Sequence, residues 1–418
     1  MTCKQERTEK ILLREGHEDY KRFAQICKIS TAIYNCANYY IRQNFFNGDF
    51  KINWQSADKY VRLKHNGLYN ALPNQSTQSI IKKLGDDWHS FYKANNEYKV
   101  APHKFKAKPK LPKYKKGLGT FISTFQSMSV KDKHIHFPKK MKLNPIRIHC
   151  CDNQEVKTST KDIVVSEIRI LPQNSAFYLE VIYKKEINNN VLLDENKVFG
   201  IDLGLNNLLT ITTNQSDLTP LLINGKMIKS INQRYNKSKA YYQANKNKSM
   251  VDRIGLYRHC AIKSYFHKVS YFIQQYCLKY NIGTIIIGKN ERWKDEINIG
   301  KVNNQNFVSV PFNLLINLIT YKAKEYGIKV IIQEESYTSK SDALACDILP
   351  IYDKKDKTNY TFKGKRKKRG LYQSSIGKLV NADVNGSLNI LRKVIGDGFI
   401  RNLINSGCVF QPIKVNLV

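Results

Sequence analysis

The stretch Phe199-Gly-Ile-Asp-Leu-Gly-Leu-Asn-Asn-Leu208 decides how the rest of this sequence is interpreted. Together with the preceding Val198, its apolar residues up to Ile201 predict a buried strand that ends at Asp202. The two asparagines that follow favour a turn into a second apolar run at 208–212. A carboxylate at the end of a buried strand costs free energy unless a cation or hydrogen bonds compensate it. On these residues alone, Asp202 is either a cation ligand or an acid that satisfies local backbone donors.

The composition points to a nucleic-acid partner. The 418 residues, enough for two or three domains, include 69 Lys and Arg against 34 Asp and Glu, a formal charge of +35. So large a charge favours a polyanion, with nucleic acid ahead of a membrane surface. We find no signal peptide and no apolar run of the roughly 18–20 residues that span a membrane. The nine cysteines form no Cys-x-x-Cys pair, which favours reduced thiols. We expect a cytoplasmic protein without membrane association.

The N-terminal half predicts helices, then a basic segment, then strands. Apolar residues at helical spacing run through 17–98, with a break at Leu72-Pro73-Asn74. From Lys99 to Lys116, eight lysines alternate with three prolines and no acid, which predicts an extended segment that follows a phosphate backbone. A flexible solvated linker is the alternative. Short apolar runs over 121–185 predict a small barrel or sheet, and Asn188-Asn189-Asn190 predicts a link.

The C-terminal half predicts an α/β domain. Its element order matches a ribonuclease H-like domain, in which the substrate site lies at the carboxyl ends of the central strands. The predicted elements are strands at 198–201, 208–212 and 221–224, helices over 226–280, a strand at 284–287, a helix at 310–326, a strand at 328–333 and a last helix at 382–394.

Three acidic positions fall where such a domain would hold metal ions. Asp202 ends the first strand, Glu334-Glu335 ends the last strand, and Asp383 opens the last helix. Carboxylates from separate elements can hold two Mg2+ ions about 4 Å apart for phosphodiester hydrolysis, and such hard cations need no His or Cys. Each acid also has a local explanation: Asp383 follows a candidate helix cap, Asn381, and the glutamates could be solvated charge. Together, in so basic a chain, they favour a nuclease. An RNA-binding structural protein would explain the charge but not the acids.

Four motifs resemble the TnpB family, whose members are transposon-encoded, RNA-guided DNA endonucleases related to type V CRISPR effectors and to the eukaryotic Fanzor proteins. Two N-terminal segments, Leu72-Pro73-Asn74-Gln75 and 105–114, are similar to TnpB as well, so the resemblance covers nearly the whole chain. The four motifs are Gly-Ile-Asp-Leu-Gly-Leu-Asn-Asn-Leu at 200–208, Ser-Tyr-Thr-Ser-Lys at 336–340, Arg-Gly-Leu-Tyr at 369–372 and Asn-Ala-Asp-Val-Asn-Gly-Ser-Leu-Asn-Ile at 381–390.

The resemblance implies a multidomain α/β architecture with an RNase H-like (RuvC) nuclease domain. It also implies a magnesium-dependent hydrolase with two Mg2+ ions that cleaves target DNA beside a short adjacent motif. A guide RNA from the transposon end would pair with the target. We expect a monomer. The implied domains are a small β-barrel (wedge-like) domain at 1–16 and 117–187, a helical recognition domain at 17–116, the RuvC-like domain at 188–340 and 370–418, and an insert at 341–369.

The sequence departs from the family pattern at its third acid. Most TnpB proteins carry the catalytic Glu directly after the strand equivalent to 284–287, where this chain has Gly288. Some TnpB relatives and Fanzors carry this acid three residues before the Thr of Thr-Ser, a spacing that selects Glu335. Strand parity alone leaves Glu334 and Glu335 open, and Glu291 is a weaker candidate. Gly288 also favours an alternative function, a nuclease-dead, RNA-guided DNA-binding transcriptional repressor.

The second departure is the zinc ribbon. Its four cysteines are absent between the Thr-Ser and the last motif, where Cys346 stands by itself, so we expect no zinc. The expected catalytic residues and Mg2+ ligands are Asp202, Glu335 and Asp383. The expected nucleic-acid-binding residues are Lys104, Lys106, Lys108, Lys110, Lys113, Lys115, Lys116, Arg234, Lys237, Lys365, Arg366, Lys367, Lys368 and Arg369.

Overall fold

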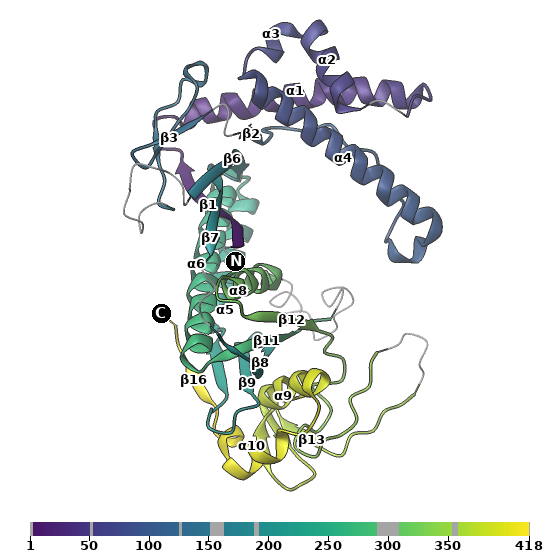
Figure 1. Cartoon of the computed structure of the whole chain (residues 1–418), viewed down its shortest axis with the longest axis vertical. Helices are drawn as coiled ribbons and strands as arrows, with labels where there is room; N and C mark the ends of the chain where they lie inside the picture. Colours follow the sequence, from purple (N-terminus) through teal and green to yellow (C-terminus); the bar gives the residue numbers. More distant parts are fainter. Residues whose placement is uncertain are drawn as a thin grey trace. The chain divides into compact units, whose positions relative to one another are not determined.

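We describe the protein from a computed structural model, in which the chain forms two compact units, Met1–Asn188 and Asn189–Val418. Figure 1 labels most of the helices and strands of both units. The structure describes residues 3–50, 53–124, 128–150, 163–187, 192–290, 309–352 and 358–417. The predicted link at 188–190 lies outside the described residues, and the finer domain boundaries stay predictions. Across the described ranges, no helix is both long and apolar enough to cross a membrane.

The helices predicted over 17–98 are confirmed in the first unit. The predicted break is confirmed too, because Pro73 caps a new helix with the backbone angle that suits a helix start. The indole of Trp88 donates to the buried Asn38 side chain at 3.0 Å and so ties two of these helices together. The helices are α1 (Tyr20–Phe46), α2 (Trp54–Lys64), α3 (Asn66–Tyr69) and α4 (Asn74–Val100).

The strands of the first unit form two sheets. The larger sheet has the order β1-β7-β6-β2, with every neighbouring pair antiparallel, and the smaller has the order β3-β4-β5. The predicted closure into a barrel stays a prediction. The strands are β1 (Cys3–Arg14), β2 (Phe121–Thr124), β3 (Ser129–Lys131), β4 (His134–His136), β5 (Ile146–Arg147), β6 (Ile163–Gln173) and β7 (Ala176–Ile187).

The basic segment at 99–116 contains the end of α4 and one short 3-10 helix, η1 (Pro102–Lys104), and continues without a regular element. Its last part is fixed along α1 by hydrogen bonds of 2.8–2.9 Å to its backbone carbonyls, so residues 112–117 are not a flexible linker. The ammonium group of Lys115 lies 3.7 Å from the centre of the Tyr34 ring, and burial lowers its pKa. The three side chain to carbonyl bonds join Arg42 to Pro112, Asn35 to Lys115 and Thr31 to Gly117.

A six-stranded sheet is the centre of the second unit. Its order is β12-β11-β8-β9-β10-β16, in which β11 is parallel to β8 and β12 while β8, β9 and β10 form an antiparallel meander. All strands that we predicted here are confirmed, and β16 is an addition. The strands are β8 (Asp194–Leu203), β9 (Asn207–Thr213), β10 (Leu221–Asn224), β11 (Ile282–Gly288), β12 (Lys329–Gln333) and β16 (Ile413–Val415).

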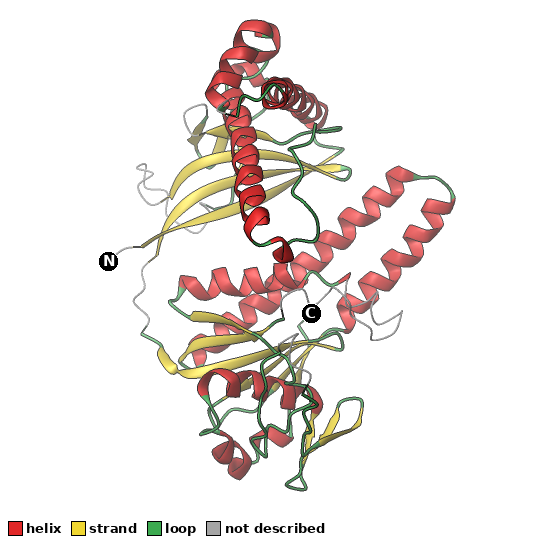
Figure 2. Cartoon of the chain, turned by 90° about the vertical axis from the view of Figure 1, so that its right-hand side faces the viewer, coloured by secondary structure: helices red, strands yellow, loops and turns green. Residues whose placement is uncertain are grey.

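Helices cover both faces of this sheet (Figure 2). Ile285 and Ile287 pack against the core that α6 and α8 cover, whereas Ile286 packs with Ile390 and Leu391 of α9 on the other face. Burial on both faces explains why β11 is a continuous apolar run. The prediction that α9 is the last helix is wrong, because α10 follows it. The helices are α5 (Lys226–Ala244), α6 (Lys248–Lys279), α8 (Phe312–Glu325), α9 (Ala382–Ile395) and α10 (Ile400–Ser406).

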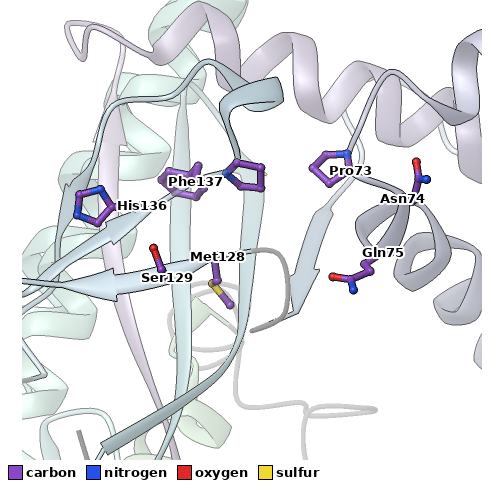
Figure 3. Close-up of a pocket in the computed structure, with 8 residues that line it drawn as sticks. Pro73, Asn74, Gln75, Met128, Ser129, His136 and Phe137 are labelled. Atoms are coloured by element: carbon purple, nitrogen blue, oxygen red, sulfur yellow. The ribbon is translucent and has the colours of Figure 1, made fainter. Parts of the chain in front are cut away.

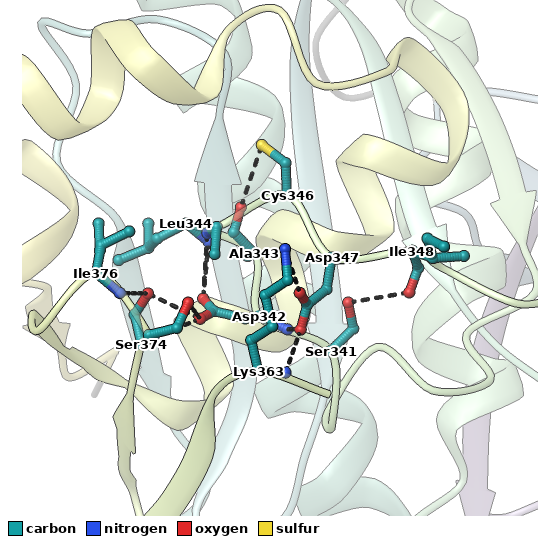
Figure 4. A network of polar contacts seen from close by, with 12 residues as sticks. Ser341, Asp342, Ala343, Leu344, Cys346, Asp347, Ile348, Lys363, Ser374 and Ile376 are labelled. Carbon is teal, nitrogen blue, oxygen red and sulfur yellow. Dashed lines mark hydrogen bonds and ion pairs between the residues drawn. The ribbon is translucent and has the colours of Figure 1, made fainter. Parts of the chain in front are cut away.

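Two aspartates accept hydrogen bonds that hold the insert at 341–369, where we expect no zinc ribbon (Figure 4). The carboxylate of the fully buried Asp342 accepts hydrogen bonds from Ser374 Oγ at 2.9 Å and from the Ser375 backbone at 2.7 Å. Asp347 accepts from the Lys363 backbone at 2.9 Å. Asp347 therefore joins two parts of the insert, and Asp342 joins the insert to the turn between β14 and β15. The strands here are β13 (Lys365–Lys368), β14 (Leu371–Gln373) and β15 (Leu379–Asn381).

Candidate active site

Glycines allow α9 to lie directly on β8. A Cβ atom on Gly200 would come within 2.6 Å of Leu391 Cγ and 2.9 Å of the Ser387 carbonyl. The hydroxyl of Ser387 donates to the Gly200 carbonyl at 2.9 Å. A Cβ atom on Gly386 would stand 3.2 Å from Asp202 Oδ2. The carboxylate at the end of β8 therefore lies against the first turns of α9.

Asp383 reaches the same place from the start of α9. The predicted helix cap is confirmed, since Asn381 Oδ1 accepts from the Asp383 backbone at 2.9 Å. The Asp383 carboxylate accepts a hydrogen bond from Asn207 Nδ2 at 2.8 Å. On its other side, its Oδ1 lies 3.6 Å from a guanidinium nitrogen of Arg366. Side chains from β9 and β13 thus hold this acid, in addition to the helix dipole that the sequence suggested.

The two adjacent glutamates face different partners. Because β12 ends at Gln333, both follow the strand, and strand parity does not choose between them. Glu334 accepts from Lys393 Nζ at 2.6 Å, and the Lys393 side chain is only 4% exposed. Burial alone would raise the pKa of Glu334, but hydrogen bonds from Lys393 and Ser336 outweigh it and lower that pKa. Glu334 is therefore committed to an ion pair with α9.

Glu335 lies at the position that Gly288 leaves open. A Cβ atom built on Gly288 would stand 2.8 Å from Glu335 Oε2, so the glutamate carboxylate lies beside the place where a side chain on β11 would begin. The backbone N–H of Glu335 donates to Asn290 Oδ1 at 2.9 Å, which connects this turn to the end of β11. Glu291, the weaker candidate, lies outside the described residues.

The charges of Glu335 and Asp383 affect the pKa of Asp202. Burial, and then the charges of Glu335 and Asp383, raise the pKa of Asp202 well above its ordinary value. The Leu203 N–H and Arg366 oppose this shift without cancelling it. Burial, followed by the charge of Glu334, raises the pKa of Glu335 to about 7. Neighbouring carboxylates that resist ionisation together are relieved by a cation between them.

The donor set of Asp202, Glu335 and Asp383 fits a hard divalent cation, because all six side-chain donors are oxygens. As the side chains stand, no three acidic, His or Cys side chains in the described part of the chain form a group ready to hold a metal ion. Binding would therefore require the carboxylates to turn toward one another. The glycines at 288 and 386 leave room around two of them.

Two asparagines of α9 hold the preceding loop, a role that we did not predict. Asn389 Nδ2 donates to the carbonyls of Thr338 and Ser341, at 2.8 and 2.7 Å. Asn385 donates to the Ser341 carbonyl at 2.8 Å and accepts from the Ala343 backbone at 3.0 Å. Their spacing of four residues, which places both on one helix face, was the available signal. The hydrogen bond from Asn207 to Asp383 joins distant parts of the chain, and no residue spacing in the sequence indicated it.

The predicted nucleic-acid-binding residues fall into separate groups. Lys365 to Arg369 are exposed on and beside β13, and Arg366 alone of these five has an ion pair with Asp383. Arg234 and Lys237 are exposed on α5. The remaining predicted residues belong to the first unit: the side chains of Lys104, Lys106, Lys108, Lys110, Lys113 and Lys116 are exposed, and that of Lys115 is half-buried.

The first unit contains a pocket of about 590 Å³ at the start of α4 (Figure 3). Pro73, Asn74 and Gln75, which belong to a TnpB-like segment of the sequence, line one side of it. The β3–β4 region lines the other side, with Ser129 and His136 among its polar groups. The pocket thus combines amide, hydroxyl and imidazole groups that can donate and accept hydrogen bonds.

Comparisons with known proteins show what this chain is similar to. A family model described as "Probable transposase" (OrfB_IS605) matches residues 181–294, and one described as "Cas12f1-like, TNB domain" matches residues 312–390. The TnpB-like protein ORF457 of Acidianus two-tailed virus is 25% identical over 438 aligned positions, which cover 92% of this chain and 86% of that protein.

A solved structure is similar in fold across most of the chain. The protein in the Cas12f1-sgRNA-target DNA complex superposes with a TM-score of 0.54 at 16% sequence identity. The match covers 89% of this chain and 82% of that one. The likeness shows a multidomain α/β fold.

Proposed function

Because this chain belongs to the TnpB family, we propose that it is an RNA-guided, Mg2+-dependent DNA endonuclease encoded by a transposon. The observation that carries the proposal is the electrostatic coupling of Asp202, Glu335 and Asp383, which come from three separate elements. A sheet in which an antiparallel meander continues into parallel strands supports a RuvC-like, RNase H-like nuclease domain.

In this proposal Asp202, Glu335 and Asp383 hold two Mg2+ ions. The chemistry that such ions supply is activation of water and stabilisation of the departing 3′ oxygen during phosphodiester hydrolysis. Asn207 holds the Asp383 carboxylate in a fixed orientation through its 2.8 Å hydrogen bond. Arg366 is a counter-charge to Asp383, and in this proposal its exposed guanidinium also contacts a phosphate of the DNA.

In this proposal the basic surfaces bind the nucleic acids, and the pocket of the first unit recognises part of the DNA. The relative named above was solved with a guide RNA and target DNA, and we propose the same two partners for this chain. Guide pairing would read most of the target, and the protein would read a short motif beside it. The Asn74–Gln75 pocket is our candidate for that reading, because amide side chains pair well with base edges.

The geometry favours the nuclease over the nuclease-dead repressor. Gly288 was the reason to consider the repressor, since it removes the acid that most TnpB proteins carry there. Glu335 Oε2 lies beside that vacated position, and its charge raises the pKa of Asp202. The carboxylate beside this position thus comes from the residues that follow β12, and not from β11. The three acids that two-metal hydrolysis needs are retained.

The test uses the full chain purified with its co-expressed guide RNA. We expect it to cut a duplex that matches the guide in Mg2+, and not in EDTA or when the target is scrambled. Asp202→Ala and Asp383→Ala should each remove cleavage while guide RNA and target binding stay within about twofold, because each removes charge that holds metal. Cleavage by either variant would contradict the assignment. Guided binding without cleavage by the natural chain would instead favour the repressor.

A further inference from the structure

A second cavity lies on the long helical hairpin of α5 and α6, which run side by side (Figure 1). Its volume is about 400 Å³, within the roughly 300–1,000 Å³ typical of ligand pockets. No Asp or Glu is among the residues that line it. The residues that matter below are three tyrosines and three arginines: Arg234, Tyr235, Tyr242, Arg253, Tyr257 and Arg258. The catalytic proposal uses none of them.

One arginine is bound within the wall of the cavity. Arg258 Nε donates to Asn232 Oδ1 at 2.7 Å, and another of its nitrogens donates to the Ser309 carbonyl at 2.6 Å. The same guanidinium lies over the Tyr235 ring, 5.1 Å from its centre. Asn232 is 1% exposed, so this network is anchored in the interior. Arg258 and Tyr235 therefore form a fixed wall, and their groups are already used in the free protein.

The remaining aromatic and basic groups are available to a ligand. Tyr257 is 65% exposed although it lines a cavity, and Tyr242 is half-buried. Arg234 and Arg253 are exposed, and neither has an ion pair with an acid among the described residues. Burying an aromatic ring against a flat partner is favourable, and a guanidinium that lacks a carboxylate partner is suited to a phosphate.

We propose that this cavity binds one unpaired nucleotide of a single strand. Its base would stack on Tyr242 and Tyr257, and its phosphate would contact Arg234 or Arg253. Aromatic rings beside basic side chains are the combination with which proteins hold unpaired bases. The absence of acids from the lining and the net charge of +35 favour an anionic ligand over a cationic one. The proposal deepens the proposed function and rests on it, since the strand is either guide RNA or one strand of the target DNA.

The test is photocrosslinking of the full chain to two probes. One is an oligouridylate with a single 5-iodouridine, and the other is an oligothymidylate with a single 5-iododeoxyuridine. Each is about 12 nucleotides long, within the roughly 4–16 nucleotides that one single-strand-binding domain covers. Peptide mapping by mass spectrometry then locates the adducts. We expect an adduct at Tyr242 or Tyr257, because iodouracil reacts with a ring on which it stacks.

Variants separate stacking from mere proximity. Tyr257→Ala and Tyr242→Ala should each lower the adduct yield at the cavity roughly tenfold, the size expected when base–aromatic stacking is removed. Tyr257→Phe keeps the ring and should retain the adduct. The matched control is Tyr271→Ala, because Tyr271 is 56% exposed on the same helix and does not line the cavity. Thermal unfolding of each variant checks that the fold is kept.

The outcomes distinguish the two proposals. An adduct with the RNA probe alone assigns the cavity to the guide, one with the DNA probe alone assigns it to the target, and one with both indicates recognition of the base without the sugar. Each supports the inference. Adducts that avoid both tyrosines, or that persist in the Ala variants, would overturn it even if guided cleavage is observed. A cavity adduct in a chain that fails to cut guided targets would contradict the nuclease proposal and leave the cavity assignment standing.

Discussion

At the scale of single residues, Gly288 and Glu335 illustrate what the sequence could and could not predict. The glycine was visible as a missing acid, and the spacing to Thr-Ser in resembling proteins selected Glu335. Strand parity failed because β12 ends at Gln333, before either glutamate. The ion pair of Glu334 with Lys393 separates the two, and it depends on a helix about 60 residues away in sequence. No local pattern carries that information, because it arises from tertiary packing.

The raised pKa of Glu335 predicts how stability depends on pH. In the folded protein this acid keeps its proton up to about pH 7, whereas the unfolded chain releases it near pH 4.5. The folded state binds more protons between these values, so the free energy of unfolding falls as the pH rises through this window. Glu335→Gln should therefore stabilise the metal-free protein at pH 8 by about 1–3 kcal/mol, and change it little near pH 4.5.

The matched control for that prediction is Glu334→Gln. It leaves the almost buried Lys393 without its carboxylate partner, so it should destabilise the protein by about 1–3 kcal/mol. Both variants are measured by thermal and denaturant unfolding in EDTA, across the pH range. Equal shifts of the same sign in the two variants would show that the glutamates do not differ as the geometry implies.

At the scale of elements, the basic segment combines a fixed backbone with exposed charge. The carbonyls of Pro112 and Lys115 accept hydrogen bonds from α1. The side chains of Lys104, Lys106, Lys108 and Lys110 are exposed, and that of Lys104 is paired with Glu97. Changing these four together to Gln should weaken guide RNA binding and reduce the slope of log affinity against log salt, by about 0.7–0.9 for each phosphate that the variant no longer neutralises. The measurement is a salt titration of binding. An unchanged slope would return the segment to a purely structural role.

Lys115 provides the contrast within the same segment. Its ammonium group lies over the Tyr34 ring and burial lowers its pKa, so Lys115→Gln should reduce thermal stability more than it reduces the salt slope. The sequence presented all eight lysines of 99–116 as equivalent. Their difference arises from packing against α1, which composition and proline spacing do not reveal.

In the insert, where we expect no zinc, a buried carboxylate provides a cross-link. Asp342 is fully buried and accepts from both Ser374 and Ser375, so Asp342→Ala should leave these donors unpaired and destabilise the protein by about 2–4 kcal/mol. A zinc chelator should leave the unfolding temperature unchanged, and metal analysis should find no stoichiometric zinc. One equivalent of tightly bound zinc would contradict this account of the segment. So would a Tm unaffected by Asp342→Ala.

At the scale of the whole molecule, local apolar runs predicted the strands and helices of the second unit well. The same runs did not predict which distant strands pair. The sequence did not place β16 beside β10, because that pairing joins residues almost 200 positions apart. The pocket on α5 and α6 was also missed, since its tyrosines and arginines are spread over two helices and individually resemble core or surface residues. Strand and helix ends indicated the acidic positions, and charge indicated a nucleic-acid partner. Motif resemblance added the choice of Glu335 and the expectation of a guide RNA.

The central claim is that Glu335 supplies the acid that Gly288 lacks. Its most direct test compares Glu335→Gln and Glu334→Gln, each purified with guide RNA, for binding and cutting of one matched duplex in Mg2+. We predict that Glu335→Gln binds the target normally and loses cleavage by at least about a hundredfold, while Glu334→Gln retains most of its activity. Full cleavage by Glu335→Gln, or loss of cleavage by Glu334→Gln at unchanged binding, would contradict the assignment.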